Sequence, residues 1–181
     1  LPENQQKAPA RECLQHAYEA FRDTASAGER TAFDTFVQQH RIWLLPYSLF
    51  EHHRRNSGNR PWWEWPDAIR SRDPVTLTAT LANGRDSLRG IAFEQYLFDH
   101  QWQRLRDYAN SRGVCLFGDL PFYVDLNSAE VWWHRKLFRV NAEGQPDAVA
   151  GVPPDYFNAD GQLWGNPIYD WKIIDRMFDS Y

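Results

Sequence analysis

The spacing of apolar residues predicts that the first third of the chain is helical. Apolar side chains recur at helical intervals over residues 10–28. A second helix is predicted over residues 32–39, capped by Thr31. A third is predicted over residues 42–53, with a break at Pro46 because proline lacks a backbone N–H. The opening nine residues show no apolar period, and we expect no regular structure there.

A loop rich in tryptophan and a long helix follow. Residues 56–74 combine glycine and proline with several tryptophans, a composition typical of turns. The clearest helix of the chain is predicted over residues 87–112, where Gly113 can close it. A last helix is predicted over residues 172–181. The tryptophans of the loop and of the short helix predicted near residue 132 are interpreted as structural: Trp62, Trp63, Trp65, Trp132 and Trp133.

The segment after the long helix indicates the fold class. Residues 114–117 form a short continuous apolar run, typical of a strand covered on both faces of a parallel sheet, and Asp119 follows directly. A helix, a buried strand and polar residues at the strand's carboxyl end predict an α/β fold, either a barrel or a doubly wound sheet. Residues 121–171 show little periodicity apart from a helix around residues 128–137, and loops this long are usually functional.

Composition and charge exclude several classes of function. The net charge of -4, with scattered Lys and Arg, gives no electrostatic footprint for nucleic acid or a membrane surface. Cys13 and Cys115 fit neither a disulfide framework nor a zinc site, which favours a reducing, cytoplasmic location. Phosphate-loop and nucleophile-elbow motifs are absent, so no cofactor or metal is implied. Aromatic residues make up 15% of the chain, which is compatible with carbohydrate binding, although buried aromatics more often form a core.

Three stretches of sequence carry a family resemblance. They are GDLPFYV at residues 118–124, AGVPPDYF at 150–157 and GQLWGNPIYDW at 161–171. Together, and with matching spacing, they closely resemble the signature of the 4-α-glucanotransferase (amylomaltase or disproportionating enzyme) family. The resemblance runs from about Phe33 to Trp171.

Two departures mark a divergent member of that family. Where the family commonly has a Trp-Leu-Asp-Asp-Tyr run, this chain has Trp-Leu-Leu-Pro-Tyr at residues 43–47. Where the family commonly has Asp-Ser-Ala-Asp, this chain has Asn-Ser-Ala-Glu at residues 127–130. The acidic contacts that the family makes near these points are therefore not carried over to this chain.

The resemblance implies a partial (β/α)8 TIM-barrel segment with an inserted, mainly helical subdomain and long cleft-forming loops. We expect the helical subdomain and Trp-rich loop at residues 1–86, and the partial barrel at residues 87–181. The family uses a retaining double displacement between two carboxylic acids, and its nucleophile follows a later barrel strand in an Arg-x-Asp-His-type run. No such run occurs here, and a complete barrel takes about 250 residues. We therefore expect a fragment that lacks the nucleophile and the acid/base.

The resemblance also assigns substrate-binding residues. Asp119 matches a carboxylate lining the subsite next to the cleaved bond; the alternative is an Asp that caps the following turn. Tyr156 and Phe157 match the tip of a mobile loop that closes over the glucan; the alternative is a loop pinned to the surface. Trp164 matches an indole platform flanked by the amides of Gln162 and Asn166; the alternative makes Trp164 core and Asn166 a turn residue.

The implied function is transfer of α-1,4-glucan segments between maltooligosaccharides. The implied partners are α-1,4-glucans and the rest of the parent chain. A second hypothesis from another class is a non-catalytic carbohydrate-binding or interaction module derived from the same fold.

Overall fold

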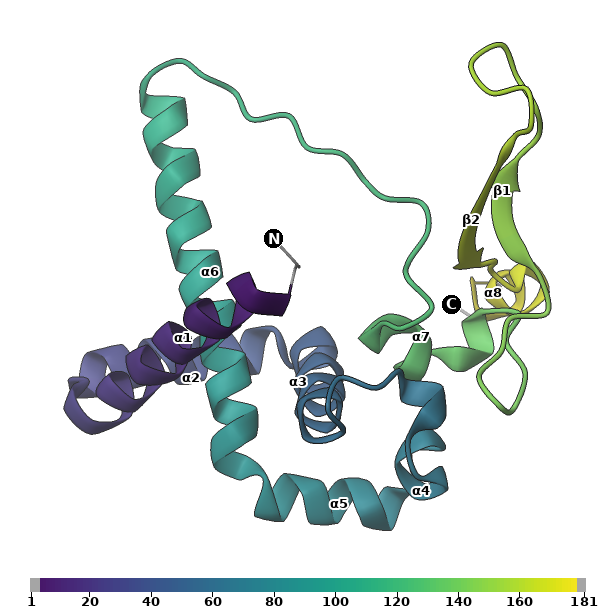
Figure 1. The fold of residues 1–181 in the computed structure, drawn as a ribbon. Helices are drawn as coiled ribbons and strands as arrows, with labels where there is room; N and C mark the ends of the chain where they lie inside the picture. The colour runs from purple at the N-terminus through teal and green to yellow at the C-terminus, as the bar shows by residue number, and fades with distance from the viewer. Residues whose placement is uncertain (1–3, 179–181) are drawn as a thin grey trace. The chain divides into compact units, whose positions relative to one another are not determined.

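The computed structural model describes residues 4–178. Over this range the chain is mostly helical, with one two-stranded sheet (Figure 1). It divides into two compact units, each formed by two stretches of the chain. Unit 1 comprises the residues up to Ser48 together with Leu81–Gly118, and unit 2 comprises Leu49–Thr80 together with the residues from Asp119 onward. No helix in the described range is long and apolar enough to cross a bilayer.

Unit 1 is built around a cluster of aromatic side chains. It contains α1 (Asn4–Thr24), α2 (Ala27–Gln39), the first part of α3 (Arg41–Asn56), the end of α5 (Pro74–Asn83) and α6 (Arg85–Ser111). The buried ring of Phe33 meets the rings of Phe21 and Phe93 edge to face, with centroids 5.6 and 5.7 Å apart. The other buried members of the cluster are Tyr18, Phe36, Leu44 and Ala92. The periodic apolar positions of the first two helices therefore do form a core.

The predicted start of the second helix is wrong. Helix α2 begins at Ala27, because Ser26 and Glu29 form a capping box. Ser26 Oγ accepts from the backbone N–H of Glu29 at 3.3 Å, and a Glu29 carboxylate oxygen accepts from the backbone N–H of Ser26 at 2.8 Å. Thr31, the predicted cap, lies inside the helix and donates its hydroxyl to the Ala27 carbonyl.

Two predicted irregularities are also wrong. Helix α3 continues through Pro46, and α1 begins at Asn4. Proline removes one backbone hydrogen bond, but Leu44, Leu49 and Phe50 of the same helix are buried, and this packing outweighs the local penalty. Glutamine, lysine and alanine dominate the first turns of α1, and these residues favour helix without an apolar period.

The long helix is confirmed as α6, but the strand predicted after it is wrong. Gly113, at φ 74°, ends α6 in a Schellman motif: Gly113 and Val114 donate to the carbonyls of Asn110 and Ala109, both at 3.0 Å. Residues 114–117 form no strand, and their side chains are exposed rather than buried by α6. A buried parallel strand requires paired neighbours, and no strand among the described residues pairs with this segment.

Unit 2 is organised by buried tryptophans. The predicted loop contains η1 (Trp62–Glu64) and α4 (Asp67–Arg70), and the short helix near residue 132 is confirmed as α7 (Ala129–Trp133) followed by η2 (Arg135–Leu137). Helix α5, which follows that loop, was not predicted. Trp62, Trp65 and Trp132 are buried, which confirms their structural interpretation. Each indole N–H has a carbonyl acceptor: Trp62 donates to Leu126 at 2.7 Å, Trp65 to Arg60 at 3.0 Å and Trp132 to Ile69 at 3.2 Å.

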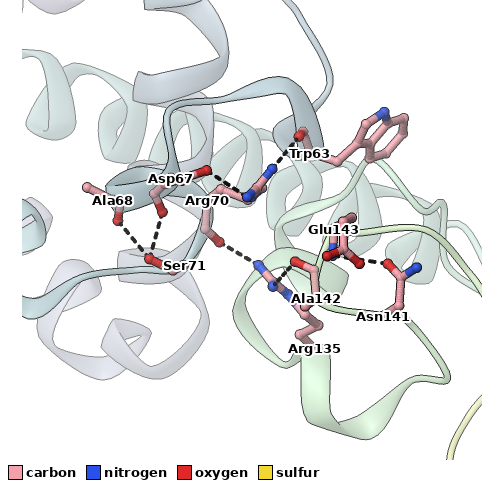
Figure 2. Close-up of polar contacts among 9 residues, drawn as sticks. All are labelled: Trp63, Asp67, Ala68, Arg70, Ser71, Arg135, Asn141, Ala142 and Glu143. Atoms are coloured by element: carbon pink, nitrogen blue, oxygen red, sulfur yellow. Dashed lines mark hydrogen bonds and ion pairs between the residues drawn. The ribbon is translucent and has the colours of Figure 1, made fainter.

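Two arginines connect the loops of unit 2 (Figure 2). Arg70 donates to the Asp67 carboxylate at 2.6 Å and to the carbonyl of Trp63 at 3.4 Å. Arg135 donates to the carbonyl of Arg70 and, at 3.2 Å, to that of Ala142. The Arg135 guanidinium also lies over the ring of Trp62, 4.7 Å from its centroid. The guanidinium groups of Arg70 and Arg135 therefore donate hydrogen bonds to backbone carbonyls that are not paired within a helix or a strand.

The sheet of unit 2 is a hairpin that the sequence pattern did not reveal. Strand β1 (Val149–Val152) pairs antiparallel with β2 (Gln162–Pro167). A Cβ on Gly151 would lie 2.5 Å from the carbonyl oxygen of Gln162, so this approach requires glycine. Helix α8 (Trp171–Phe178) follows and confirms the predicted last helix as far as Phe178; residues 179–181 of that prediction lie outside the described residues.

Candidate functional site

Five of the six predicted site residues lie on one hairpin. Gln162, Trp164 and Asn166 belong to β2, and Tyr156 and Phe157 lie in the connection between β1 and β2. The sixth, Asp119, lies outside the hairpin in a segment without regular structure, where its side chain is exposed. Residues of two separate signature stretches therefore belong to one hairpin, three on its second strand and two in its connecting loop.

The indole of Trp164 lies on β2, where a hydrogen bond from its ring nitrogen fixes its orientation. Its side chain is 47% exposed, and its Nε1 donates to Gln162 Oε1 at 3.0 Å. Residues two apart on a strand share a face, which explains why these two side chains meet. The ring of Tyr123 meets the Trp164 ring at 62°, with centroids 6.0 Å apart. Trp164 is therefore half exposed and supported on one side by a second aromatic ring.

Asn166 ties the hairpin to the segment that carries Asp119. Its amide Nδ2 donates to the backbone carbonyl of Val124 at 2.9 Å. Gly165, at φ 81°, turns the backbone between Trp164 and Asn166, a conformation that glycine adopts without strain. The segment after Asp119 is thus fixed against β2 by a hydrogen bond and by the Tyr123 ring contact.

The tip of the hairpin exposes two aromatic side chains almost completely. Tyr156 is 96% exposed and Phe157 is 92% exposed, and their rings meet each other edge to face. The backbone beneath them is ordered by Asp155, whose Oδ1 accepts from the N–H groups of Phe157 at 2.9 Å and Asn158 at 2.8 Å. Asp155 itself donates its N–H to the Asn158 carbonyl at 2.9 Å. A structured turn therefore holds two large apolar groups in solvent, the arrangement of a surface that contacts a ligand or another segment.

Tyr123 is a further candidate site residue, which sequence reasoning missed. Besides the contact with Trp164, its ring stacks on that of Tyr169 with an interplanar angle of 18° and centroids 6.4 Å apart. Tyr169 in turn contacts Phe138 and Trp171. The available signal was its position inside the first signature stretch, but aromatic residues in an irregular segment carry no spacing that separates ligand contact from packing.

Comparison with known proteins identifies the family. A model of glycosyl hydrolase family 77, described as 4-alpha-glucanotransferase, matches residues 4–179. The chain belongs to the 4-α-glucanotransferase family. Among the described residues, 4–178, no three His, Cys, Asp or Glu side chains gather in a way that would hold a metal ion.

Family members of known sequence and structure are about three times as long as this chain. The 4-alpha-glucanotransferase of Thermus thermophilus is 40% identical over 168 residues, covering 93% of this chain and 34% of the Thermus protein. That of Aquifex aeolicus is 36% identical over 166 residues, covering 92% and 33%. The chain spans about a third of the length of these relatives.

A solved structure extends the likeness to three dimensions. The amylomaltase of Streptococcus agalactiae in complex with acarbose has a TM-score of 0.84 and 33% identity to this chain. The match covers 96% of this chain and 34% of that one. This likeness indicates an α-amylase-like TIM-barrel parent, of which the chain is a part with mostly helices and a two-stranded sheet.

Proposed function

We propose that the parent of this chain transfers α-1,4-glucan segments between maltooligosaccharides by a retaining double displacement in a (β/α)8 barrel. The chain supplies part of the glucan cleft and neither the nucleophile nor the acid/base. Membership of the 4-α-glucanotransferase family and the activity named for the Thermus thermophilus relative support this proposal. Within the parent, residues 1–86 form a helical subdomain and residues 87–181 a partial barrel segment with its cleft loops.

The β1–β2 hairpin is the observation that carries the proposal. A half-exposed indole beside an amide offers a glucose ring both an apolar face and a hydrogen-bonding group, which are the two kinds of contact that a sugar requires. Trp164 stacks on the ring, and Gln162 and Asn166 bind its hydroxyls. The Streptococcus agalactiae amylomaltase was solved in complex with acarbose, which supports binding of α-glucans by the parent of this chain.

The remaining site residues have distinct roles in this proposal. The Asp119 carboxylate accepts hydrogen bonds from sugar hydroxyls in the subsite next to the cleaved bond. Tyr156 and Phe157 close over the bound glucan, a role that agrees with the exposure of both rings. Closure would exclude water and so favour transfer to an acceptor sugar over hydrolysis.

The reaction itself needs groups that this chain does not supply. A retaining mechanism requires two carboxyl groups about 5 to 5.5 Å apart on opposite sides of the glycosidic bond. Asp119 is the one carboxylate of this chain that the family resemblance places at the cleaved bond. The isolated 181-residue chain should therefore release no glucose or longer maltooligosaccharides from maltotriose, whereas the full-length protein should release both. Disproportionation by the purified chain, above a heat-killed control, would contradict the assignment of the nucleophile to another part of the parent.

Two substitutions in the full-length protein test the proposed roles. Trp164→Ala should lower kcat together with kcat/KM, since it removes contacts made as the sugar ring distorts. Tyr156→Ala should instead raise KM and increase hydrolysis relative to transfer, because a lid residue helps to bind and enclose the glucan. Product ratios and kinetics with maltotriose measure both effects.

Trp43→Ala provides the matched control. Trp43 is also a tryptophan with a half-exposed side chain, but it lies on α3, outside the hairpin. Its loss should leave the kinetics of transfer unchanged. Equal effects of the Trp43 and Trp164 substitutions, or normal kinetics of Trp164→Ala in a protein of lowered melting temperature, would assign Trp164 a structural role. A full-length protein that binds maltooligosaccharides without transferring them would favour the non-catalytic module.

A further inference from the structure

A second candidate site lies in unit 1, and none of its lining residues belongs to the proposed glucan cleft. It is a cavity of about 260 Å³ between helices α2, α3, α5 and α6, and all its lining residues belong to unit 1. Its walls are mainly aliphatic, including Leu44, Leu45, Leu81 and Leu88. Cavities of about 150 Å³ already hold benzene, and drug-sized ligands occupy about 300 Å³ or more, so the cavity suits a small molecule with an apolar body.

The charged groups that line this pocket are all cationic. Arg41, Arg85 and Arg89 line it, and no acidic residue does. Arg89 is neutralised by Asp34, whose Oδ1 accepts from its guanidinium at 2.8 Å. Arg41 and Arg85 make no ion pair with any described residue. Two guanidinium groups therefore remain available to an anion at the edge of an apolar pocket.

Local backbone geometry adds to this positive potential. Arg41 and Arg85 are the first residues of α3 and α6, which are 16 and 27 residues long. The N-terminus of a helix carries a partial positive charge, and Gly84, which precedes α6, provides no side-chain cap. Both arginines thus lie at the positive ends of long helices.

A buried hydroxyl points independently to a ligand in this pocket. Ser48 lines the pocket, is only 3% exposed, and its Oγ has no hydrogen-bond partner among the described residues. Hydroxyls in helices usually donate to the carbonyl four residues earlier, as Thr31 and Thr35 do in α2. An unpartnered buried hydroxyl is costly unless a ligand or water satisfies it.

Of the two departures at residues 45 and 46, the one at Leu45 falls in this pocket. Leu45 and Arg41 both line the cavity; the family resemblance described above implies an acidic residue at position 45, where this chain has leucine. An Asp there would offer the arginines a carboxylate and remove an apolar wall. The substitution by leucine does the opposite, making the pocket both apolar and electropositive.

We propose that this pocket binds a small amphipathic carboxylate, with its apolar body against the leucines and its head between Arg41 and Arg85. The ligand's carboxylate accepts from the two guanidinium groups, and the Ser48 hydroxyl donates to an oxygen of the same ligand. This binding site is additional to the proposed glucan cleft and shares no residue with it.

The test uses octanoate as the probe and the full-length protein, with affinity measured by titration calorimetry. We expect saturable binding with a Kd between about 0.1 and 1 mM, from the ligand efficiency typical of small ligands. Octanamide, which keeps the apolar body but not the charge, should bind at least about fivefold more weakly. Acetate, which keeps the charge alone, should show no saturation at about 10 mM.

Substitutions assign the binding to this pocket. Each exposed ion pair contributes about two- to fivefold, so the double variant Arg41→Gln/Arg85→Gln should weaken octanoate binding about four- to twenty-fivefold. The same variant should leave octanamide binding unchanged. Leu45→Asp, at a partly exposed position where the family commonly carries an acid, should weaken octanoate binding at least about tenfold.

Two control variants distinguish this pocket from the rest of the protein surface. Arg104→Gln removes an exposed arginine of α6 that does not line the pocket. Trp164→Ala removes the exposed indole of the hairpin. Both variants should retain wild-type octanoate affinity. Melting temperatures confirm that the pocket variants fold. Absence of saturable octanoate binding by the wild-type protein overturns the proposal. This result is expected if another segment of the parent fills the pocket. Equal affinities for octanoate and octanamide, or unchanged affinity in the pocket variants, also overturn the proposal.

Discussion

Replacing Gly144 by alanine should destabilise unit 2 more than any glycine substitution on its open surface. Gly144 is buried and adopts a φ of 86°. A Cβ built there would lie 2.6 Å from an atom of the Trp62 ring and 2.7 Å from the Cβ of Trp63. These distances are shorter than van der Waals contact, so the substitution introduces a clash as well as backbone strain.

The Trp62 ring cannot easily move to relieve this clash. Its Nε1 donates to the Leu126 carbonyl at 2.7 Å, its backbone N–H donates to Asn127 Oδ1 at 3.2 Å, and the Arg135 guanidinium covers its face. Left-handed backbone costs a non-glycine residue about 1 to 2 kcal/mol, and overpacking a rigid core costs about 1 to 3 kcal/mol. Gly144→Ala should therefore lower the free energy of unfolding by about 2 to 5 kcal/mol.

Comparison with Gly58→Ala separates the packing part of this loss from the backbone strain. Gly58 also has a positive φ, of 68°, but a Cβ there meets no atom within 4 Å. Its replacement should cost about 1 to 2 kcal/mol from strain alone, and the effect of alanine on the unfolded chain is common to both variants. Urea unfolding followed by tryptophan emission measures both losses, since three tryptophans of unit 2, Trp62, Trp65 and Trp132, are buried and become exposed on unfolding. Equal losses in the two variants would refute the clash with Trp62.

Further predictions concern a helix cap and a buried histidine. Ser26→Ala should lower the free energy of unfolding by about 1 kcal/mol, because it removes half of the capping box that begins α2; thermal denaturation monitored by circular dichroism measures the loss. Burial, with a smaller contribution from the charge of His52, lowers the pKa of His53 to about 4. The unfolded chain then binds a proton below about pH 6.5 while the folded protein does not, so stability should fall as the pH decreases from about 6.5 to 4, by up to about 3 kcal/mol. Urea midpoints at pH 5 and 7.5 measure this decline, which should be smaller in His53→Phe; an equal decline in that variant would contradict the role of His53.

Elements determined by local sequence could be predicted, and those determined by distant partners could not. The long helix α6 has a sustained apolar period and a glycine in the position of a Schellman cap, both visible within its own residues. Residues 114–117 have the composition of a buried strand, but a strand forms only where a neighbour accepts its hydrogen bonds. At Pro46 the local sequence predicts a helix break, but buried residues on either side of it keep α3 helical.

The candidate site shows the same division. Motif resemblance selected Gln162, Trp164 and Asn166, yet nothing in their spacing showed that they lie on a strand, because β2 does not alternate apolar and polar residues. The hairpin forms where Gly151 allows close backbone approach, a requirement that only a known pairing partner reveals. Tyr123 was missed for the same reason, since its ring contact with Trp164 joins two segments without regular spacing.

The two proposed sites depend on separate sets of contacts, and this makes each testable without the other. The hairpin is held by β1–β2 pairing, by the Asx turn at Asp155 and by the bond from Asn166 to Val124, all within unit 2. The arginine-lined pocket is formed by helices of unit 1 and shares no residue with that set. Substitutions at sites with no shared partners usually act additively. Leu45→Asp should therefore change octanoate affinity while leaving glucan transfer unaltered, and Trp164→Ala should do the reverse. The double variant Leu45→Asp/Trp164→Ala should transfer glucan at the same rate as Trp164→Ala alone. A different rate would show that the pocket and the cleft are coupled, which neither set of contacts by itself predicts.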